Sequence, residues 1–156
     1  MLEAVAEGGG AFAATVAERE ARPRTWWEAR LSLDPEAAER VLGAFVDGHL
    51  AGVAGLRVAR RERTRHKATL FGVVVRPEHR GRGLARALVE AVLEEAASLP
   101  DVRVVQLTVV ETNGRARRLY EGCGFVPFGT EPMALRLGDR FVSMVHLWRQ
   151  VSAEAE

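Results

Sequence analysis

Runs of apolar residues with strand-like spacing dominate the middle of the chain. Two such runs, at 41–46 and 49–58, are joined by Asp47 and Gly48. An Asp-Gly pair between apolar runs is a strong signal for a two-residue hairpin turn. After a basic loop, a further apolar run at 67–75 predicts the next antiparallel strand. The pattern therefore predicts three consecutive antiparallel strands.

Helical spacing dominates on both sides of these strands. Ahead of them, 11–31 has a helical pattern that breaks near Arg22 and Pro23, and 34–37 is typical of a turn or of a short helical start. Behind them, an apolar stripe at helical spacing predicts a helix that starts at 84 and ends before Pro100. The remaining expected elements are a strand at 102–110, a helix at 113–120, and a final strand pair at 125–128 and about 141–149 with a turn at Gly138 and Asp139.

Composition and charge are those of an ordinary soluble domain. The chain has 156 residues, of which 47% are hydrophobic and 28% charged, and its net charge is +1. We expect one domain over 1–156 with no general attraction to nucleic acid or membranes. The basic stretch 57–67 has no aromatic residues between its arginines, so a solvated loop is favoured there over a nucleic-acid site.

Cysteine usage and the lack of long apolar runs indicate a cytoplasmic protein. Cys123 has no second cysteine to pair with, and no apolar run approaches a membrane span of roughly 20 residues. The start of the chain lacks the basic region of a signal peptide. The four histidines are scattered without partners at ligand spacing, so no metal is expected. Cys123 itself is expected to pack as a small apolar residue.

The candidate chemistry starts in the turn between the third strand and the long helix. Gly81 and Gly83 lack a Cβ, so the backbone N–H groups of this turn can approach an anion closely. The helix start adds amides without helical partners and a partial positive charge. Arg80, Arg82 and Arg86 add formal charge. This combination predicts a pyrophosphate site.

Two common nucleotide motifs do not fit this turn. The chain has no G-x-x-x-x-G-K-[ST] loop, and Arg86 occupies the position of the third glycine of G-x-G-x-x-G. Residues 80–85 (R-G-R-G-L-A) instead closely resemble [QR]-x-x-G-x-[GA], the acetyl-CoA signature of the GNAT (GCN5-related) N-acetyltransferase superfamily. A plain surface turn is disfavoured because strand, turn and helix occur together.

A second segment carries the other half of the resemblance. Residues 113–125 (N-G-R-A-R-R-L-Y-E-G-C-G-F) are similar to the family pattern N-x-x-A-x-x-L-Y-x-x-x-G-F. Asn113 and Tyr120 are seven residues apart, about two helical turns, so they share one helix face. Gly124 suits a left-handed helix C-cap. Taken singly, Asn113 also fits a helix N-cap and Tyr120 a core tyrosine.

The resemblance covers about 36–150 and implies an α/β (α+β) GNAT fold, a mixed and mostly antiparallel sheet with helices on both faces. Family members usually begin with an edge strand, whereas this chain begins with residues 1–5 and a glycine triplet. We therefore expect the first strand to be missing or to be replaced by those residues.

The resemblance also implies acetyl-CoA as a cosubstrate, bound without a metal. In the family two strands, here 67–75 and 102–110, splay apart, and the pantetheine arm lies between them. The residues implied in cofactor binding are Val73 and Val75 through their backbone, the pyrophosphate turn of Arg80, Gly81, Arg82, Gly83, Leu84, Ala85 and Arg86, and Asn113.

Two residues are expected to take part in catalysis. Tyr120 matches the family tyrosine near the thioester sulfur, so its phenol would donate a proton or hydrogen bond to the departing thiolate. Glu111, at the end of the second splayed strand, is the best local base for the protonated amine, and a solvated carboxylate is its alternative role. His79 lies on the phosphate side and is expected at the surface.

The expected function is transfer of an acetyl group from acetyl-CoA to a primary amine by direct attack in a ternary complex. A non-catalytic CoA-binding regulatory module is the alternative, and the presence of Tyr120 argues against it. The expected partner is a small-molecule, peptide or protein amine, with no nucleic acid and no membrane. The acceptor and the choice between a monomer and a homodimer stay open at this stage.

Overall fold

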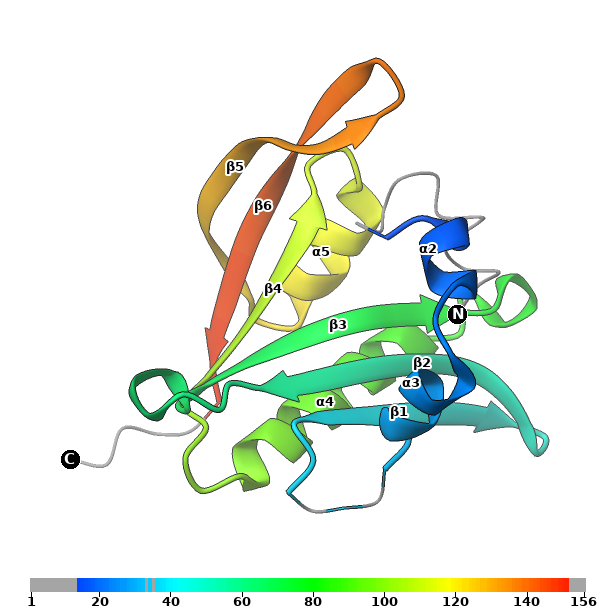
Figure 1. The fold of residues 1–156 in the computed structure, drawn as a ribbon, viewed down its shortest axis with the longest axis vertical. Coiled ribbons are helices and arrows are strands. Elements are labelled where there is room, and N and C mark those ends of the chain that lie inside the picture. Colours follow the sequence, from blue (N-terminus) through cyan, green and yellow to red (C-terminus); the bar gives the residue numbers. More distant parts are fainter. Residues whose placement is uncertain (1–13, 33, 35, 152–156) are drawn as a thin grey trace.

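Six strands form one mixed sheet (Figure 1), and the computed structural model describes residues 14–32, 34 and 36–151. The strand order across the sheet is β1-β2-β3-β4-β6-β5. The strands are β1 (Glu39–Val46), β2 (His49–Val58), β3 (Lys67–Val75), β4 (Val104–Val110), β5 (Val126–Leu137) and β6 (Arg140–Gln150). The helices are α2 (Val16–Glu20), α3 (Arg24–Ala29), α4 (Leu84–Ser98) and α5 (Gly114–Gly122), with short 3-10 turns η1 (Glu62–Thr64) and η2 (Pro77–His79).

The two central strands are joined only at one end. β3 and β4 are the parallel pair of a sheet whose other neighbours are antiparallel. Their pairing starts at Lys67 with Val104 and stops at Thr69 with Gln106. β2 continues to pair with β3 as far as Val75, and β6 continues to pair with β4 as far as Val110. The two strands therefore part as they run forward, as the splay of 67–75 and 102–110 predicts.

A bulge in β3 lies inside this opening. Gly55 pairs with Phe71, and Val53 pairs with Val74. Between these two pairs β3 therefore contains one residue more than β2. Gly72 has a φ of 63° at this point, a conformation that glycine adopts without a steric penalty. Because of this extra residue, Val73 and Val75 face the same side as Ala68 and Leu70 of the core, which strict alternation along β3 would not allow.

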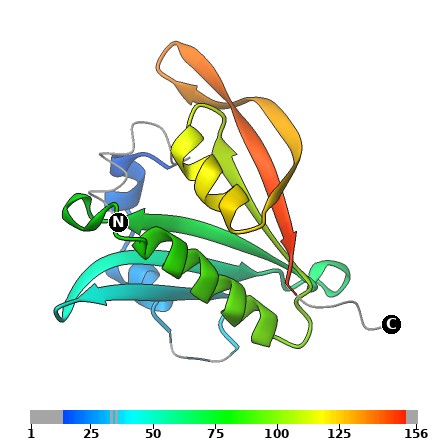
Figure 2. The same ribbon diagram turned by 180° about the vertical axis from the view of Figure 1, so that it is seen from behind.

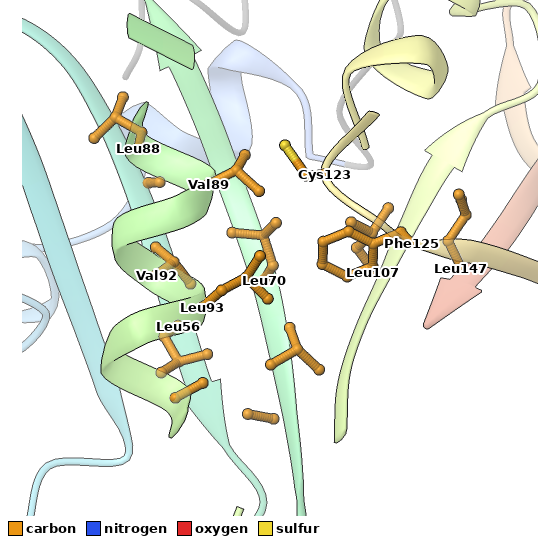
Figure 3. Packing of buried hydrophobic residues seen from close by; sticks show 14 of the residues in the cluster. Leu56, Leu70, Leu88, Val89, Val92, Leu93, Leu107, Cys123, Phe125 and Leu147 are labelled. Atoms are coloured by element: carbon orange, nitrogen blue, oxygen red, sulfur yellow. The ribbon is translucent and has the colours of Figure 1, made fainter. Parts of the chain in front are cut away.

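Helices cover both faces of the sheet. α4 and α5 lie on one face, and α2 and α3 lie on the other (Figures 1 and 2). The core fills the space between the sheet and α4 (Figure 3). Its largest fully buried side chains are Leu56, Leu147, Val89, Val92, Val102 and Val105. Burial of these aliphatic side chains holds α4 against the strands that form the opening.

The hairpin and the main elements form where the pattern predicts them. Asp47 and Gly48 have positive φ angles of 49° and 77°, as a two-residue hairpin turn with a right-handed twist requires. β3 has the predicted bounds, 67–75. The helical pattern of 11–31 resolves into α2 and α3 with the break at Arg22 and Pro23. Its residues 11–13, and the residues 1–5 expected to replace a first strand, lie outside the described part of the chain.

The expected end of the fifth strand at 128 is wrong. β5 continues to Leu137, but its pairing with β6 shifts between Glu131 and Leu135, and Met133 has a φ of 53°. This irregular stretch, which includes a proline, breaks the alternation of apolar and polar residues that marks a strand. No helix within the described residues is long and apolar enough to cross a membrane.

The core predicts a large stability difference between two leucines. Leu56 is fully buried in β2, whereas Leu31 is 66% exposed. Leu56→Ala should lower the free energy of unfolding by about 2–5 kcal/mol because it removes buried methyl groups and leaves a cavity. Leu31→Ala should change it by no more than about 0.5 kcal/mol. Urea denaturation measures both, and equal losses would contradict the packing described for Leu56.

Candidate active site

A cavity of about 510 Å³ lies where the end of β3 meets the start of α4 and one face of α5. The residues that line it are Val73, Val74, Val75, His79, Arg80, Gly81, Gly83, Leu84, Ala85, Arg86, Asn113, Arg115, Ala116, Leu119 and Tyr120. Both segments that resemble the family patterns therefore face one space, although about thirty residues separate them in the chain. Of the residues expected to bind the cofactor, Arg82 is outside this lining.

The turn before α4 has the geometry of an anion site. Gly81 and Gly83 have φ angles of 75° and 79°, and Gly83 is the N-cap of α4. No side chain caps α4, so its first amides keep their hydrogens directed out of the helix start. Because Gly81 and Gly83 line the cavity, these amides lie at its wall. A phosphate group placed there would meet several N–H donors and the positive end of the helix dipole.

The arginines of the turn differ in what they contact. The Arg80 Nε donates to the backbone oxygen of Val75 at 3.0 Å, which fixes the turn against the end of β3. The Arg86 Nη1 donates to the backbone oxygen of Gly122 at 3.0 Å and lies 3.5 Å from a carboxylate oxygen of Glu90. Arg86 thus links α4 to α5 in addition to facing the cavity. Arg82 is exposed.

The opening between β3 and β4 supplies the second wall of the site. Beyond Thr69 the edge of β3 that faces β4 pairs with no strand in the described part of the chain. Val74 and Val75 are paired on their other side, with Val53 and Gly52. Val74 and Val75 line the cavity. Their backbone groups can therefore form hydrogen bonds with an extended amide chain, as the backbone of a neighbouring strand would.

α5 presents Asn113 and Tyr120 to the cavity. The Asn113 side-chain oxygen accepts a hydrogen bond from the Ala116 N–H at 3.1 Å, so this residue is the N-cap of the helix. The side-chain amide nitrogen of Asn113 has two further donor hydrogens. Gly124 has a φ of 82°, which ends the helix in the left-handed conformation that the pattern predicts. Asn113 therefore caps the helix with its side-chain oxygen and still has its amide hydrogens available at the cavity wall.

Tyr120 both packs against the core and opens to the cavity. Its ring contacts the edge of the Phe125 ring, with the two centroids 6.1 Å apart. Burial raises the pKa of Tyr120 to about 12, and the neighbouring Cys123 raises it further. The phenol is therefore protonated over the whole neutral range and acts as a hydrogen-bond donor. Cys123 is buried in the core, as expected, and burial raises the pKa of its thiol.

Two further titratable residues are placed differently from each other. His79 lies on the phosphate side, but it lines the cavity, and its Nδ1 is buried without a hydrogen-bond partner among the described residues. The expectation that His79 is a surface residue is therefore wrong. Glu111 is exposed at the end of β4, and its backbone N–H donates to the Ser143 oxygen at 3.0 Å. Its side chain is outside the cavity lining.

Sequence reasoning missed a histidine on the opposite face of the sheet. His146 lies between buried Val145 and Leu147 on β6, so it faces away from the core, beside Thr108 of β4. Its Nε2 is 3.1 Å from a carboxylate oxygen of Glu131. In the sequence, His146 alternates with the apolar residues Val145 and Leu147, and this pattern indicates a side chain that faces away from the core. Within the described residues no cluster of histidine, cysteine or carboxylate side chains could hold a metal ion.

The comparisons with known proteins agree with this geometry. Residues 10–125 match the model described as the acetyltransferase (GNAT) family. The chain is 33% identical over 114 residues to L-amino acid N-acetyltransferase of Escherichia coli, and the match covers 72% of this chain and 68% of that protein. It is 36% identical over 64 residues to spermidine N(1)-acetyltransferase of Vibrio cholerae, where the match covers 41% of this chain and only 37% of that protein.

The fold has close counterparts among solved structures. An acetyltransferase structure from Salmonella typhimurium, solved with its cofactor acetyl-CoA, superposes with a TM-score of 0.74. The comparison covers 100% of this chain and 93% of that one. Sequence identity is 21%, so this likeness establishes the shared fold.

The burial of Tyr120 predicts its titration. Tyr120 is the only tyrosine in the chain, so tyrosinate absorbance reports on it alone. We expect a midpoint near pH 12 instead of the ordinary 10, because burial disfavours the charged phenolate. A pKa that is raised by folding stabilises the protein fully below pH 10, and this contribution is lost as the pH rises from 10 to about 12.

The control for this titration is Tyr120→Phe. That variant should show no tyrosinate absorbance and a smaller fall in melting temperature between pH 10 and 12 than the unchanged protein. A midpoint at 10 in the folded protein would show that water reaches the phenol freely.

Proposed function

Because the chain belongs to the GNAT family of acetyltransferases, we propose that it is an enzyme that transfers the acetyl group of acetyl-CoA to a primary amine. The observation that carries the proposal is the cavity itself. One space joins the phosphate-binding turn of Gly81 and Gly83, the opening beside β3, and the phenol of Tyr120. These features fit the pyrophosphate, the pantetheine amides and the thioester of acetyl-CoA in that order.

The turn and the strand edge bind the cosubstrate in this proposal. Amides at the start of α4 and the charge of Arg80 hold the pyrophosphate, so no metal ion is needed. The backbone of Val73 and Val75 pairs with the pantetheine arm, and Asn113 bonds one of its amides. Arg82, exposed beside this turn, reaches the outer phosphate oxygens from solvent.

The transfer step forms a C–N bond and breaks a C–S bond. The neutral amine attacks the thioester carbonyl carbon, and the electron pair of the C–S bond leaves on sulfur. An ordinary thiol has a pKa near ~8.5, well below the value of about 12 that burial imposes on Tyr120. The phenol therefore keeps its own proton and stabilises the thiolate by donating a hydrogen bond to it. The attacking nitrogen loses one proton to solvent as the amide forms, and the thiolate takes one proton from solvent.

The amine must lose a proton before it attacks. We propose Glu111 as the base, acting through water because its side chain is exposed at the end of β4 and outside the cavity lining. The pair of His146 and Glu131 is a second candidate, since it lies next to β4 on the face opposite α4. Glu111→Gln and His146→Gln are compared in one assay of CoA release. The substitution that lowers kcat identifies the base.

The proposal also concerns the binding partners of the protein and its location in the cell. An amine substrate is the partner that the proposal requires, and the two relatives named above act on an L-amino acid and on spermidine. A net charge of +1 supports the absence of a nucleic-acid or membrane partner. The single cysteine, buried and unable to form an internal disulfide, supports a cytoplasmic location. A single domain over 1–156 stays a prediction, and the choice between a monomer and a homodimer stays open.

The phosphate-binding turn predicts metal-independent binding. Titration calorimetry with acetyl-CoA in the presence of a chelator should show binding, because backbone amides and arginines take the place of a cation. Gly83→Val should weaken this binding by about tenfold or more, since valine at a φ of 79° distorts the turn. Binding that appears only after magnesium is added would contradict the proposal.

Gly138→Val is the matched control for this prediction. Gly138 also has a positive φ, 64°, and no atom lies within 4 Å of a Cβ placed there, but it lies in the β5–β6 turn outside the cavity lining. Both variants should lose stability by about 1–3 kcal/mol from backbone strain. Equal losses of acetyl-CoA affinity would show that strain, and not the site, explains the Gly83 result.

The role of Tyr120 predicts a loss of kcat. Tyr120→Phe should lower kcat by roughly ten- to a thousandfold, because the lost hydrogen bond forms mainly in the transition state. Acetyl-CoA affinity should stay within a few-fold of the original value. The assay is CoA release with the amine that gives the fastest turnover, beside a melting curve on the same preparation.

A purely structural tyrosine would give the opposite pattern. Tyr120→Phe would then lower the melting temperature while kcat per folded molecule stayed unchanged. Acetyl-CoA binding without CoA release from any amine would instead favour the alternative of a non-catalytic CoA-binding module.

A further inference from the structure

Four arginines surround two aromatic rings on the face of the sheet opposite α4. The guanidinium carbons of Arg19, Arg22 and Arg30 lie 5.5, 5.2 and 3.8 Å from the centre of the Trp26 ring. Arg30 also lies 5.5 Å, and Arg57 5.0 Å, from the centre of the Phe71 ring. We call these four arginines the arginine cluster. They come from α2, the α2–α3 link, the end of α3 and β2.

The arginine cluster lies over β2 and β3, and β3 is one of the two strands that form the opening. Phe71 is two residues past Thr69, where the pairing of the two strands ends. Leu70 is buried in the core, so Phe71 faces the other way, and its ring covers Gly55 so closely that a Cβ there would overlap it. The cavity for acetyl-CoA occupies the α4 side of the opening. An amine that reached the thioester from the opposite side of the sheet would pass the face on which the arginine cluster lies.

Positive charge in the arginine cluster is only partly neutralised. Glu39 pairs with Arg30 at 3.2 Å and with Arg57 at 2.6 Å. Among the described residues no carboxylate forms an ion pair with Arg19 or Arg22, and the Arg19 Nε is buried without a hydrogen-bond partner.

On α2, hydrogen bonds from Thr15 lower the pKa of the Glu18 carboxyl, and the charges of Arg22 and Arg19 lower it further. Both the backbone N–H and the hydroxyl of Thr15 donate to Glu18, at 2.7 and 3.0 Å, in the cap of the helix. Burial, followed by repulsion from Arg19, Arg57 and Arg22, lowers the pKa of Arg30, while Glu39 opposes this effect. Arginine nevertheless stays charged at neutral pH, so this face of the sheet carries excess positive charge at the arginine cluster.

We propose that the arginine cluster selects an acceptor amine that carries a carboxylate, such as a free amino acid, over a polyamine. This inference rests on the proposed acetyl transfer and names its substrate class. A carboxylate would complete the ion pairs that Arg19 and Arg22 lack, through charge-assisted hydrogen bonds. A polyamine would bring further cations toward guanidinium groups and would be repelled.

A purely structural role for the arginine cluster makes a different prediction. Arg30 lies between Trp26 and Phe71 and pairs with Glu39, so it fastens α3 to the sheet. Arg22 is exposed, and within the cluster its guanidinium lies over the Trp26 ring, 5.2 Å from the ring centre. Removal of its charge tests substrate selection with little disturbance of the packing.

The first experiment compares acceptors with and without the carboxylate. CoA release is measured with a panel of L-amino acids, with the carboxamide of each, and with spermidine. We expect kcat/KM for the preferred amino acid to exceed that for its carboxamide by about tenfold or more, mainly through KM. The amine of a carboxamide is less protonated at neutral pH, so amine reactivity alone would favour the carboxamide.

The second experiment removes one charge at a time. Arg22→Gln should raise KM for the amino acid about tenfold, leave its kcat within a few-fold, and leave the carboxamide nearly unaffected. Arg24→Gln is the matched control, because Arg24 is a neighbouring arginine that pairs with Glu28 at 2.6 Å and is 90% exposed. It should leave both substrates unchanged. A melting curve on each variant confirms that it is folded.

The outcomes separate this inference from the proposed function. Equal use of amino acids and carboxamides, or a preference for spermidine, overturns the selection by charge and leaves acetyl transfer intact. Equal effects of Arg22→Gln and Arg24→Gln overturn the assignment of the arginine cluster. Binding of acetyl-CoA without CoA release from any of these amines overturns both proposals.

Discussion

The separation of β3 from β4 after Thr69 and Gln106 is the constraint on which the rest of the structure depends. Backbone groups at a strand edge need hydrogen-bond partners, and an unpaired edge inside a domain is costly unless something else pairs with it. Each of the two strands is held in place on its outer side, β3 by β2 and β4 by β6. The opening is therefore built rigidly, and its edges can bind an extended amide chain.

The helices on the α4 side make this opening specific. Leu88, Val89 and Val92 bury α4 against the sheet, so its uncapped start stays at the mouth of the opening. Arg86 ties α4 to the end of α5 through the Gly122 backbone oxygen, and the Tyr120 backbone oxygen accepts from the Phe125 N–H at 3.1 Å. These contacts hold the turn before α4 close to the helix that carries Tyr120, and a reactant bound at both places needs such a fixed separation.

Short-range signals made much of this architecture predictable. The hairpin at Asp47 and Gly48 and the glycine conformations at 81, 83 and 124 follow from backbone sterics that each residue carries with it. The extension of β5 past 128 was not predictable in this way, because Met133 adopts a positive φ and the pairing shifts around it. The burial of the His79 Nδ1 depends on neighbours from other elements, which no local pattern encodes.

The two sides of the opening differ in chemistry for a related reason. On the α4 side, the site comes from two continuous segments, so its motifs are visible in the chain. On the other side, the arginine cluster combines Arg19, Arg22 and Arg30 with Arg57 of a distant strand, around rings at Trp26 and Phe71. Such a surface forms only when α2 and α3 fold over the sheet, so its residues can vary without disturbing the cofactor motifs. Family membership thus specifies the acetyl donor, whereas the acceptor proposed above depends on charges that only the folded chain brings together.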